Sequence, residues 1–216
     1  MVGGFDLASV SSGVTYVRGE WDGSRVFIEA VQERAYRLEN NFVSHYEGAK
    51  CMLGDSVKFR QQYGLDLCAI EDYTLQSLSM VSFSIGEVGG LVRGFHFDVG
   101  FPILLNRPVI MRSFAADGRK IPKGPPGKRS LVAWAEEDFA YVSSCKYAKQ
   151  RSDCSDAYWH AAIGVFTLMF LDGVPLEAIS PKRRETWRNK KQTGILDNLV
   201  DRLFLPQRYN GPLQRV

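Results

Sequence analysis

Four acidic residues in this chain occupy positions at which carboxylates can bind a metal ion. Asp6 ends the apolar start of the first expected strand, and Glu71 follows an apolar run at 67–70 that ends another. Asp153 and Asp156 open the last long helix that we expect, and their spacing of three residues places both on one helix face. Carboxylates at the ends of buried elements lose hydration, which a pair of divalent cations would compensate. Such hard oxygen ligands suit Mg²⁺ or Mn²⁺.

Each carboxylate also has a purely structural interpretation. Asp153 is suited to cap the helix N-terminus, where the helix dipole would also favour Asp156 in the first turn. Asp6 is compatible with a turn, and Glu71 with the surface at the end of a strand. His160, one turn beyond Asp156, faces either the candidate site or the core. These alternatives stay open for each residue alone, and it is the combination of four carboxylates that favours a metal site.

The elements that must position these residues alternate between strands and helices. The patterns of apolar and turn-forming residues predict strands over 3–8, 13–17, 25–31, 65–71 and 108–114, and helices over 45–62, 82–94, 130–142 and 153–172. This order predicts an α/β domain, a mixed sheet with helices packed on it. The helix over 82–94 contains four glycines, which lower helix propensity and make sense if another backbone approaches closely.

The composition is typical of a globular protein outside the membrane. Hydrophobic residues make up 45% and charged residues 24% of the 216 residues, and no apolar run reaches the roughly 20 residues of a membrane span. The four cysteines have no metal-ligand spacing and the N-terminus has no export pattern, so we expect reduced thiols and a cytoplasmic protein, in the host cytoplasm if the source is a virus. The stretch GPPGKRS is not a phosphate-binding loop, because Pro122 and Arg129 stand where that motif needs Gly and Ser or Thr. We therefore expect no nucleotide cofactor.

Positive charge is concentrated in two segments. Residues 119–129 contain five Lys or Arg, and residues 181–216 contain nine against three Asp or Glu, whereas residues 1–180 carry a net charge of −3. This distribution is typical either of a protein with a polyanionic partner or of two solvated loops. It predicts a domain over 1–179 followed by a basic C-terminal extension over 180–216.

Several segments together resemble the motifs of a known nuclease family. GFDLASVSSGVTYV at 4–17 resembles the first motif of RuvC-type Holliday-junction resolvases, in which a strand ends in Asp and a small-residue turn leads to a second strand. AIEDY at 69–73 resembles the second motif, and DCSDAYWHAA at 153–162 resembles the fourth, D-x-x-D-A followed by small and apolar residues. Between them, SIGEVGGLVRG at 84–94 resembles the helix after the second motif, and the segment 107–135 resembles the family's strand, basic loop and helix.

The resemblance spans roughly residues 3–172 and implies a ribonuclease-H-like fold, a mixed five-stranded sheet flanked by helices, here with the basic extension. It implies a homodimeric endonuclease that resolves four-way DNA junctions by paired nicks, with two Mg²⁺ ions per active site and Mn²⁺ as a substitute. On this basis Asp6 would bridge the two ions, while Glu71 and Asp156 would each hold one side. Asp153 would complete the catalytic and metal-binding set.

The resemblance also implies DNA contacts outside the carboxylates. The family has a junction-opening aromatic residue three places after the Glu of the second motif; here Thr74 stands at that position, and Tyr73 beside it is the candidate substitute. The family often has Pro-Gly after the first Asp, where this chain has the small pair Leu7 and Ala8. The basic candidates for DNA contact are Arg119, Lys120, Lys123, Lys128, Arg129, Lys182, Arg183 and Arg184.

Two other functions remain open at this level. The same fold could serve a branch or flap nuclease, or a ribonuclease acting on RNA–DNA hybrids. A strictly monomeric protein would favour these, because a resolvase needs two active sites. A non-catalytic junction-binding protein could use the basic segments alone, but an inactive relative would be expected to lose at least one of the four carboxylates.

Overall fold

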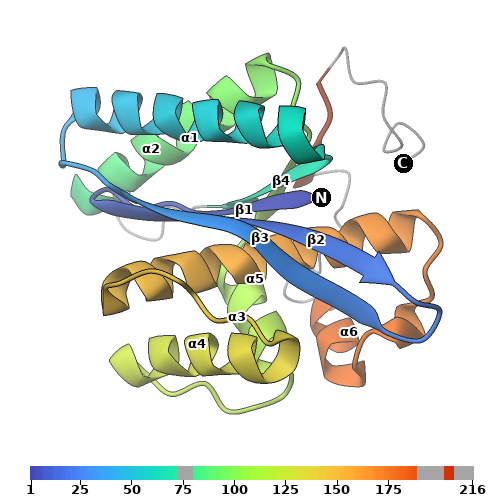
Figure 1. Cartoon of the computed structure of the whole chain (residues 1–216). Helices are drawn as coiled ribbons and strands as arrows, with labels where there is room; N and C mark the ends of the chain where they lie inside the picture. The colour runs from blue at the N-terminus through green and yellow to red at the C-terminus, as the bar shows by residue number, and fades with distance from the viewer. Residues whose placement is uncertain (73–79, 189–201, 207–216) are drawn as a thin grey trace.

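Six strands and six α-helices make up the part of the chain that the structure, a computed structural model, describes: residues 1–72, 80–188 and 202–206 (Figure 1). The strands are β1 (Val2–Asp6), β2 (Ser11–Trp21), β3 (Val26–Arg37), β4 (Leu67–Glu71), β5 (Ile103–Asn106) and β6 (Leu203–Phe204). The helices are α1 (Phe42–Tyr63), α2 (Met80–Asp98), α3 (Pro108–Ala116), α4 (Pro125–Phe139), α5 (Ala148–Leu171) and α6 (Pro181–Arg188), with a 3₁₀ turn at Leu176–Ala178. Of the helices described, none has the length and apolar character needed to cross a membrane.

The strands form one mixed sheet in the order β3-β2-β1-β4-β5-β6. β1, β4 and β5 run parallel to one another, whereas β2, β3 and β6 are antiparallel to their neighbours. The predicted mixed α/β sheet is confirmed. Its described part has six strands instead of the expected five, because Leu203–Phe204 of the basic extension pairs with β5.

Helices cover both faces of the sheet: α1 and α2 lie on one face, and α3, α4 and α5 lie on the other (Figure 1). The alternation of side chains along each strand produces these two interfaces. In β1, Val2 packs in the core beside α5, while Phe5 packs in the core beside α1. In β4, Leu67 and Ala69 face α5, whereas Ile70 faces α1. The central strands are therefore apolar on both faces, as strands between two helical layers must be.

The strand predicted over 108–114 is wrong. Pro108–Ala116 forms helix α3, and the strand of this region is the four-residue β5 that directly precedes it. Pro108 lies in the first helical turn, where its missing N–H is not needed. The buried residues of this segment, such as Ile110 and Phe114, recur at helical rather than alternating spacing.

Helix α5 begins earlier than predicted, at Ala148. The residues at 148–151 are Ala, Lys, Gln and Arg, all strong helix formers, and they add a turn before the acidic pair. The N-cap interpretation of Asp153 is therefore wrong, and so is the expectation that Asp153 and Asp156 open the helix. Both residues lie inside α5.

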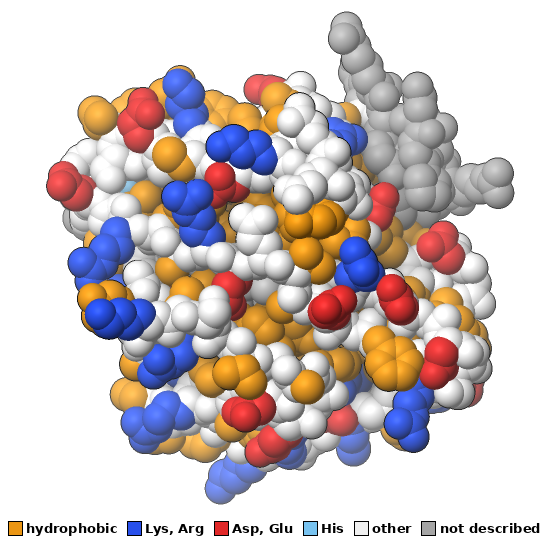
Figure 2. Space-filling view, viewed as in Figure 1, with side chains coloured by type: hydrophobic (Ala, Val, Ile, Leu, Met, Phe, Trp, Pro, Cys, Tyr) orange, Lys and Arg blue, Asp and Glu red, His pale blue; other side chains and the backbone are white. Residues whose placement is uncertain are grey.

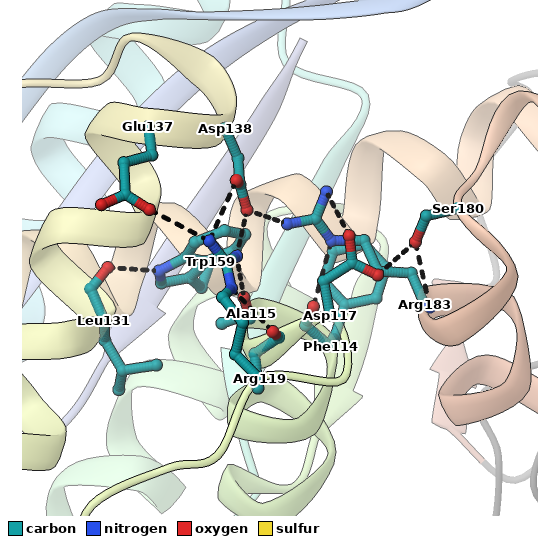
Figure 3. Close-up of polar contacts among 11 residues, drawn as sticks. Phe114, Ala115, Asp117, Arg119, Leu131, Glu137, Asp138, Trp159, Ser180 and Arg183 are labelled. Atoms are coloured by element: carbon teal, nitrogen blue, oxygen red, sulfur yellow. Dashed lines mark hydrogen bonds and ion pairs between the residues drawn. The ribbon is translucent and has the colours of Figure 1, made fainter.

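The start of the basic extension packs on α3 and α4 through a group of charges, of which Arg183 is buried and Arg119 and Asp138 are partly exposed (Figure 3). Arg119 and Arg183 both donate hydrogen bonds to the carboxylate of Asp138. The Arg183 guanidinium is 5.1–5.5 Å from the centroids of three aromatic rings, those of Phe114, Phe139 and Trp159. We call these six residues the Asp138 cluster. Arg183 is 8% exposed, so it anchors α6 to the domain.

Candidate active site

The carboxyl ends of β1, β4 and β5 bring polar side chains to one edge of the sheet, on the face that α5 covers. Gly4 of β1 and Ala69 of β4 contact α5. Because side chains alternate along a strand, Asp6 and Glu71, two positions further on, face α5 as well. Asn106 is the register partner of Glu71 in the neighbouring strand. Three strand ends therefore present two carboxylates and an amide to the same helix.

Glycines in β1 and β2 allow α5 to lie directly on the sheet. A Cβ atom at Gly4 would lie 1.9 Å from the carbonyl oxygen of Ala157, and one at Gly13 would lie 2.2 Å from that of Asp153. Only a residue without a side chain fits at these distances. The two glycines thus set the height of α5 above the strand ends and so position its acidic residues.

Asp153, Asp156 and His160 project from one face of α5, because they are spaced by three and then four residues. Asp153 and Asp156 are each 4% exposed, and His160 is fully buried. The hydroxyl of Ser11 in β2 donates a hydrogen bond of 2.5 Å to Oδ2 of Asp153 and fixes that oxygen. Helix α5 thus adds two carboxylates and an imidazole to the strand ends.

The structure brings the four predicted carboxylates into one neighbourhood. Asp6 and Glu71 share a side-chain hydrogen bond, and each offers an oxygen that lies within 4.8 Å of the other and of a ring nitrogen of His160. Asp153 and Asp156 lie close enough to Asp6 to repel its charge. A lysine on α4 forms a long ion pair with Asp156: Lys128 Nζ is 3.9 Å from Oδ2, and the side chain of this lysine is half exposed.

Burial and mutual repulsion disfavour the charged forms of these groups. Burial, and next the charge of Glu71, raises the pKa of Asp6 well above its usual value. Burial, and next the charge of Asp6, raises the pKa of Asp156 from 3.8 to about 8, although Lys128 opposes this. Burial lowers the pKa of His160 to about 3, so its imidazole is neutral at physiological pH. The positive charge near the site is therefore too small to offset the burial and mutual repulsion of the carboxylates. Carboxyl groups with raised pKa values are common in functional sites.

Several buried polar atoms at the site have no hydrogen-bond partner among the residues that the structure describes. They are Oδ1 of Asp156, Oδ1 of Asn106 and both ring nitrogens of His160. Buried polar atoms are rarely left unpaired in folded proteins. Clustered carboxylates that retain protons, next to oxygen and nitrogen atoms with free lone pairs, form a donor set for a divalent cation. The residues present fit a Mg²⁺ or Mn²⁺ ion.

A groove of about 1220 Å³ runs beside α3, α4 and the start of α5 and reaches Asp153. Six cationic residues line it: Arg107, Arg112, Lys123, Lys128, Arg129 and Lys149. Figure 2 shows Lys and Arg side chains gathered along the left and lower edges of the molecule, the side on which α5 begins in Figure 1. A positively charged groove that leads to carboxylates suits the phosphate backbone of a nucleic acid.

Of the five predicted DNA-contacting residues in the basic segment 119–129, four have side chains at the surface or in the groove. Lys123, Lys128 and Arg129 line the groove, and Lys120 is exposed. Tyr73, the candidate junction-opening aromatic, lies outside the described residues.

The other four predicted DNA-contacting residues lie in different surroundings. Arg119 and Arg183 are part of the Asp138 cluster, where their guanidinium groups are engaged by protein acceptors. Lys182 and Arg184 each form an ion pair with a glutamate at the surface. Arg119 and Arg183 are therefore better suited to stabilise the fold than to bind DNA.

Some residues at the site were missed by the sequence analysis. Asn106 was missed because the strand that carries it was not predicted. Ser11 received no role, since its partner Asp153 is 142 residues away and no local pattern signals the contact. Arg112 was assigned to a strand, and only as part of α3 does it line the groove.

The sheet order, the two helical layers and the carboxylates at the strand ends define a ribonuclease-H-like α/β fold. The fold is similar to that of RuvC: two structures of Thermus thermophilus RuvC, one in complex with a Holliday junction substrate, each match this chain with a TM-score of 0.58. Their sequence identities are 14% and 13%, and each match covers 78% of this chain and 95% or 96% of the RuvC chain.

A yeast mitochondrial Holliday junction resolvase, Ydc2, matches more weakly, with a TM-score of 0.48 and 11% identity over 80% of this chain and 84% of that chain. At the level of sequence, no protein-family model and no curated protein matches the chain. The predicted fold is thus confirmed by structural similarity alone.

Proposed function

We propose that this chain is a divalent-metal-dependent endonuclease that cuts branched DNA and resolves four-way junctions by paired nicks. The observation that carries the proposal is the convergence of Asp6 and Glu71 from the strand ends with Asp156 from α5. The RuvC-like fold supports it, because one of the similar structures is a RuvC in complex with a Holliday junction substrate.

Asp6, Glu71 and Asp156 are the residues that would hold Mg²⁺, with Asp153 positioned beside them by Ser11. When bound, such ions act as Lewis acids and offset the charge that develops on a phosphodiester during hydrolysis. The chain itself keeps the carboxylates close together and limits their exposure to water, so that the pKa values of Asp6 and Asp156 are raised and these two groups hold their protons more tightly than a free carboxyl does. Metal affinity should therefore rise with pH, because the ligands must lose those protons.

The groove is the surface that we propose for a DNA arm. Lys123, Lys128 and Arg129 line it before and within the first turns of α4, where the positive end of the helix dipole also favours phosphate. Lys128 is half exposed and near Asp156, so it can bind a phosphate beside the carboxylates. Lys120 and Lys182 are exposed and extend the basic surface.

Paired nicks on opposite strands need two active sites, so we propose that the chain works as a homodimer. The glycines of α2 leave room for a partner: Gly90 and Gly94 are exposed, and a Cβ atom at Gly86, Gly90 or Gly94 would have no described neighbour outside the helix within 4 Å. Sedimentation velocity at micromolar concentration should show a dimer. A strict monomer would instead favour a flap nuclease or a hybrid-specific ribonuclease of the same fold.

Cleavage of a synthetic four-way junction, a flap and an RNA–DNA hybrid, compared in Mg²⁺, tests the proposed activity. We expect symmetric nicks in the junction that are abolished by EDTA and by Asp156→Asn. Asp98→Asn, which changes an exposed carboxylate at the end of α2, is the control and should cut normally. Junction cleavage that survives Asp156→Asn would contradict the metal site. Preferred cutting of the flap or hybrid would change the substrate, and binding without cleavage would indicate a junction-binding protein.

A further inference from the structure

One of the three histidines differs from the other two in its surroundings. His45 Nδ1 lies 2.5 Å from a carboxylate oxygen of Glu87, and its Nε2 lies 3.0 Å from the carbonyl oxygen of Ser9. Both ring nitrogens of His96 are likewise within hydrogen-bond distance of a protein oxygen. His160 is as deeply buried as His96, yet neither of its ring nitrogens has a hydrogen-bond partner within the described chain.

The imidazole of His160 lies next to the carboxylates of the candidate active site. A ring nitrogen of His160 is within 4.8 Å of oxygens from both Asp6 and Glu71. The backbone at this position is also held: Nδ2 of Asn106 donates to the carbonyl oxygen of His160 at 3.4 Å, which ties this turn of α5 to the end of β5. The ring therefore points toward the strand ends on a turn that the neighbouring strand holds in place.

A role in core packing does not explain a histidine at this position. A buried polar group without a partner destabilises the folded state, and an apolar side chain of similar size would avoid this. In the described part of the chain, no carboxylate oxygen is hydrogen-bonded to either ring nitrogen. A ligand that accepts the lone pair of a neutral imidazole nitrogen, within reach of two carboxylates, is a metal ion.

We propose that His160 is a direct nitrogen ligand of the divalent ion held by Asp6 and Glu71, which makes the centre a mixed oxygen and nitrogen site. This inference rests on the metal site of the proposed function and adds a ligand and a metal preference to it. Imidazole suits transition-metal ions, whereas Mg²⁺ prefers oxygen ligands, and Mn²⁺ accepts the carboxylates as well. The chain should therefore bind Mn²⁺ in clear preference to Mg²⁺.

Pulsed electron paramagnetic resonance of the full-length protein with Mn²⁺ alone tests the nitrogen ligand without any substitution. We expect the ¹⁴N coupling of a directly bound imidazole in the Mn²⁺ signal. Because the ring nitrogens of His45 and His96 already contact protein oxygens, this coupling would be assigned to His160. Bound Mn²⁺ without such coupling would overturn the inference.

The variant His160→Gln, which keeps a polar side chain of similar length, should lose the ¹⁴N coupling and bind Mn²⁺ at least about tenfold more weakly, with a smaller loss for Mg²⁺. The control is His45→Gln, which removes a histidine from the start of α1 and should leave both affinities and the coupling unchanged. Wild-type Mn²⁺ affinity and coupling in His160→Gln would overturn the inference. If Asp6→Asn still abolished Mn²⁺ binding in that case, the metal site would stand without His160. Failure of the wild-type protein to bind any Mn²⁺ would overturn both proposals.

Discussion

Two groups of buried and partly buried charges pack against the same helix and differ in how their charges are balanced. In the Asp138 cluster, one carboxylate accepts from two guanidinium groups, and Arg183 is stacked among three aromatic rings (Figure 3). At the candidate active site, carboxylates lie next to carboxylates, and Lys128, at 3.9 Å from Asp156, is half exposed. Trp159 of the first group and His160 of the second are adjacent residues of α5.

This difference distinguishes charged residues that stabilise the fold from charged residues that we propose bind a ligand. Charges that stabilise the fold are paired by the protein itself, as Arg183 is by Asp138. The fold holds the carboxylates at the strand ends close together although they repel one another, and this repulsion lowers the stability of the protein. Such an arrangement is retained in proteins where a ligand compensates the repulsion. The contrast predicts that substitutions in the Asp138 cluster will change stability, whereas substitutions at the carboxylates will change activity.

The largest expected effect is the loss of activity in Asp6→Asn. Removal of this proposed metal ligand should lower the rate of junction cleavage by roughly 10³-fold, because metal ions contribute several kcal/mol of transition-state stabilisation. The metal-free variant should unfold at the same temperature as the wild type or a higher one, since a repelled carboxylate is gone. Single-turnover cleavage and thermal unfolding measure the two quantities. A variant that cuts normally but unfolds much earlier would place Asp6 with the structural charges.

Arg183→Ala should show the opposite behaviour. Removal of this buried guanidinium leaves Asp138 with only Arg119 as its arginine partner and removes the contacts to three rings, so it should lower the free energy of unfolding by about 3 kcal/mol. Denaturant titration measures the loss, and the remaining folded protein should cut a junction at the wild-type rate. Lys182→Ala, which removes an exposed ion pair in the same helix, should change stability by less than about 1 kcal/mol. An equally small loss of unfolding free energy in Arg183→Ala and Lys182→Ala would show that the Asp138 cluster is not structurally important.

The stability of the metal-free protein should fall as pH rises from 6.5 to 8. The pKa of Asp156 is about 8 in the folded protein and near 3.8 when unfolded, so between these values the folded state holds the extra proton and loses stability with increasing pH. Below about pH 6.5 the buried His96 and His160, whose pKa values are lowered, act in the opposite direction, which fixes the lower limit of the window. Thermal unfolding in EDTA measures the decline, and Asp156→Asn should reduce it. The same decline in both proteins would contradict the assignment to Asp156.

The smallest expected effect is that of Lys128→Gln on DNA affinity. If Lys128 contacts one phosphate, the slope of log affinity against log salt concentration should decrease by about 1. Fluorescence anisotropy with a labelled junction in Ca²⁺, to prevent cutting, measures the slope. Lys58→Gln, on the helix that covers the opposite face of the sheet, is the matched control and should keep the wild-type slope.

The sequence predicted the parts of the fold whose signals are local. The apolar run that ends at Glu71 predicted β4 well, because a buried parallel strand is apolar on both faces. The segment after Pro108 was misread as a strand, since its branched apolar residues favour strands while its burial follows helical spacing. The start of α5 was predicted too late because its first residues are polar helix formers, and the buried face that signals the helix begins only at Asp153.

The spacing of the acidic residues predicted a candidate site, but not its internal geometry. The distances among Asp6, Glu71 and His160 depend on strand register and on the close approach of α5 over Gly4 and Gly13, which no single segment encodes. The distinction between buried and surface ion pairs also required tertiary structure, because Arg183 and Lys182 are neighbours in sequence and both are paired, but only Arg183 is buried.

The most direct test of the metal site is the dependence of the unfolding temperature on divalent cations at pH 8. A ligand at 100 times its dissociation constant stabilises a protein by about 2.7 kcal/mol, so Mg²⁺ or Mn²⁺ should raise the unfolding temperature of the wild type by several degrees. The double variant Asp6→Asn/Asp156→Asn should show no such rise. An equal rise in both proteins, or none in the wild type at millimolar Mn²⁺, would contradict the claim that these carboxylates are built to hold a cation.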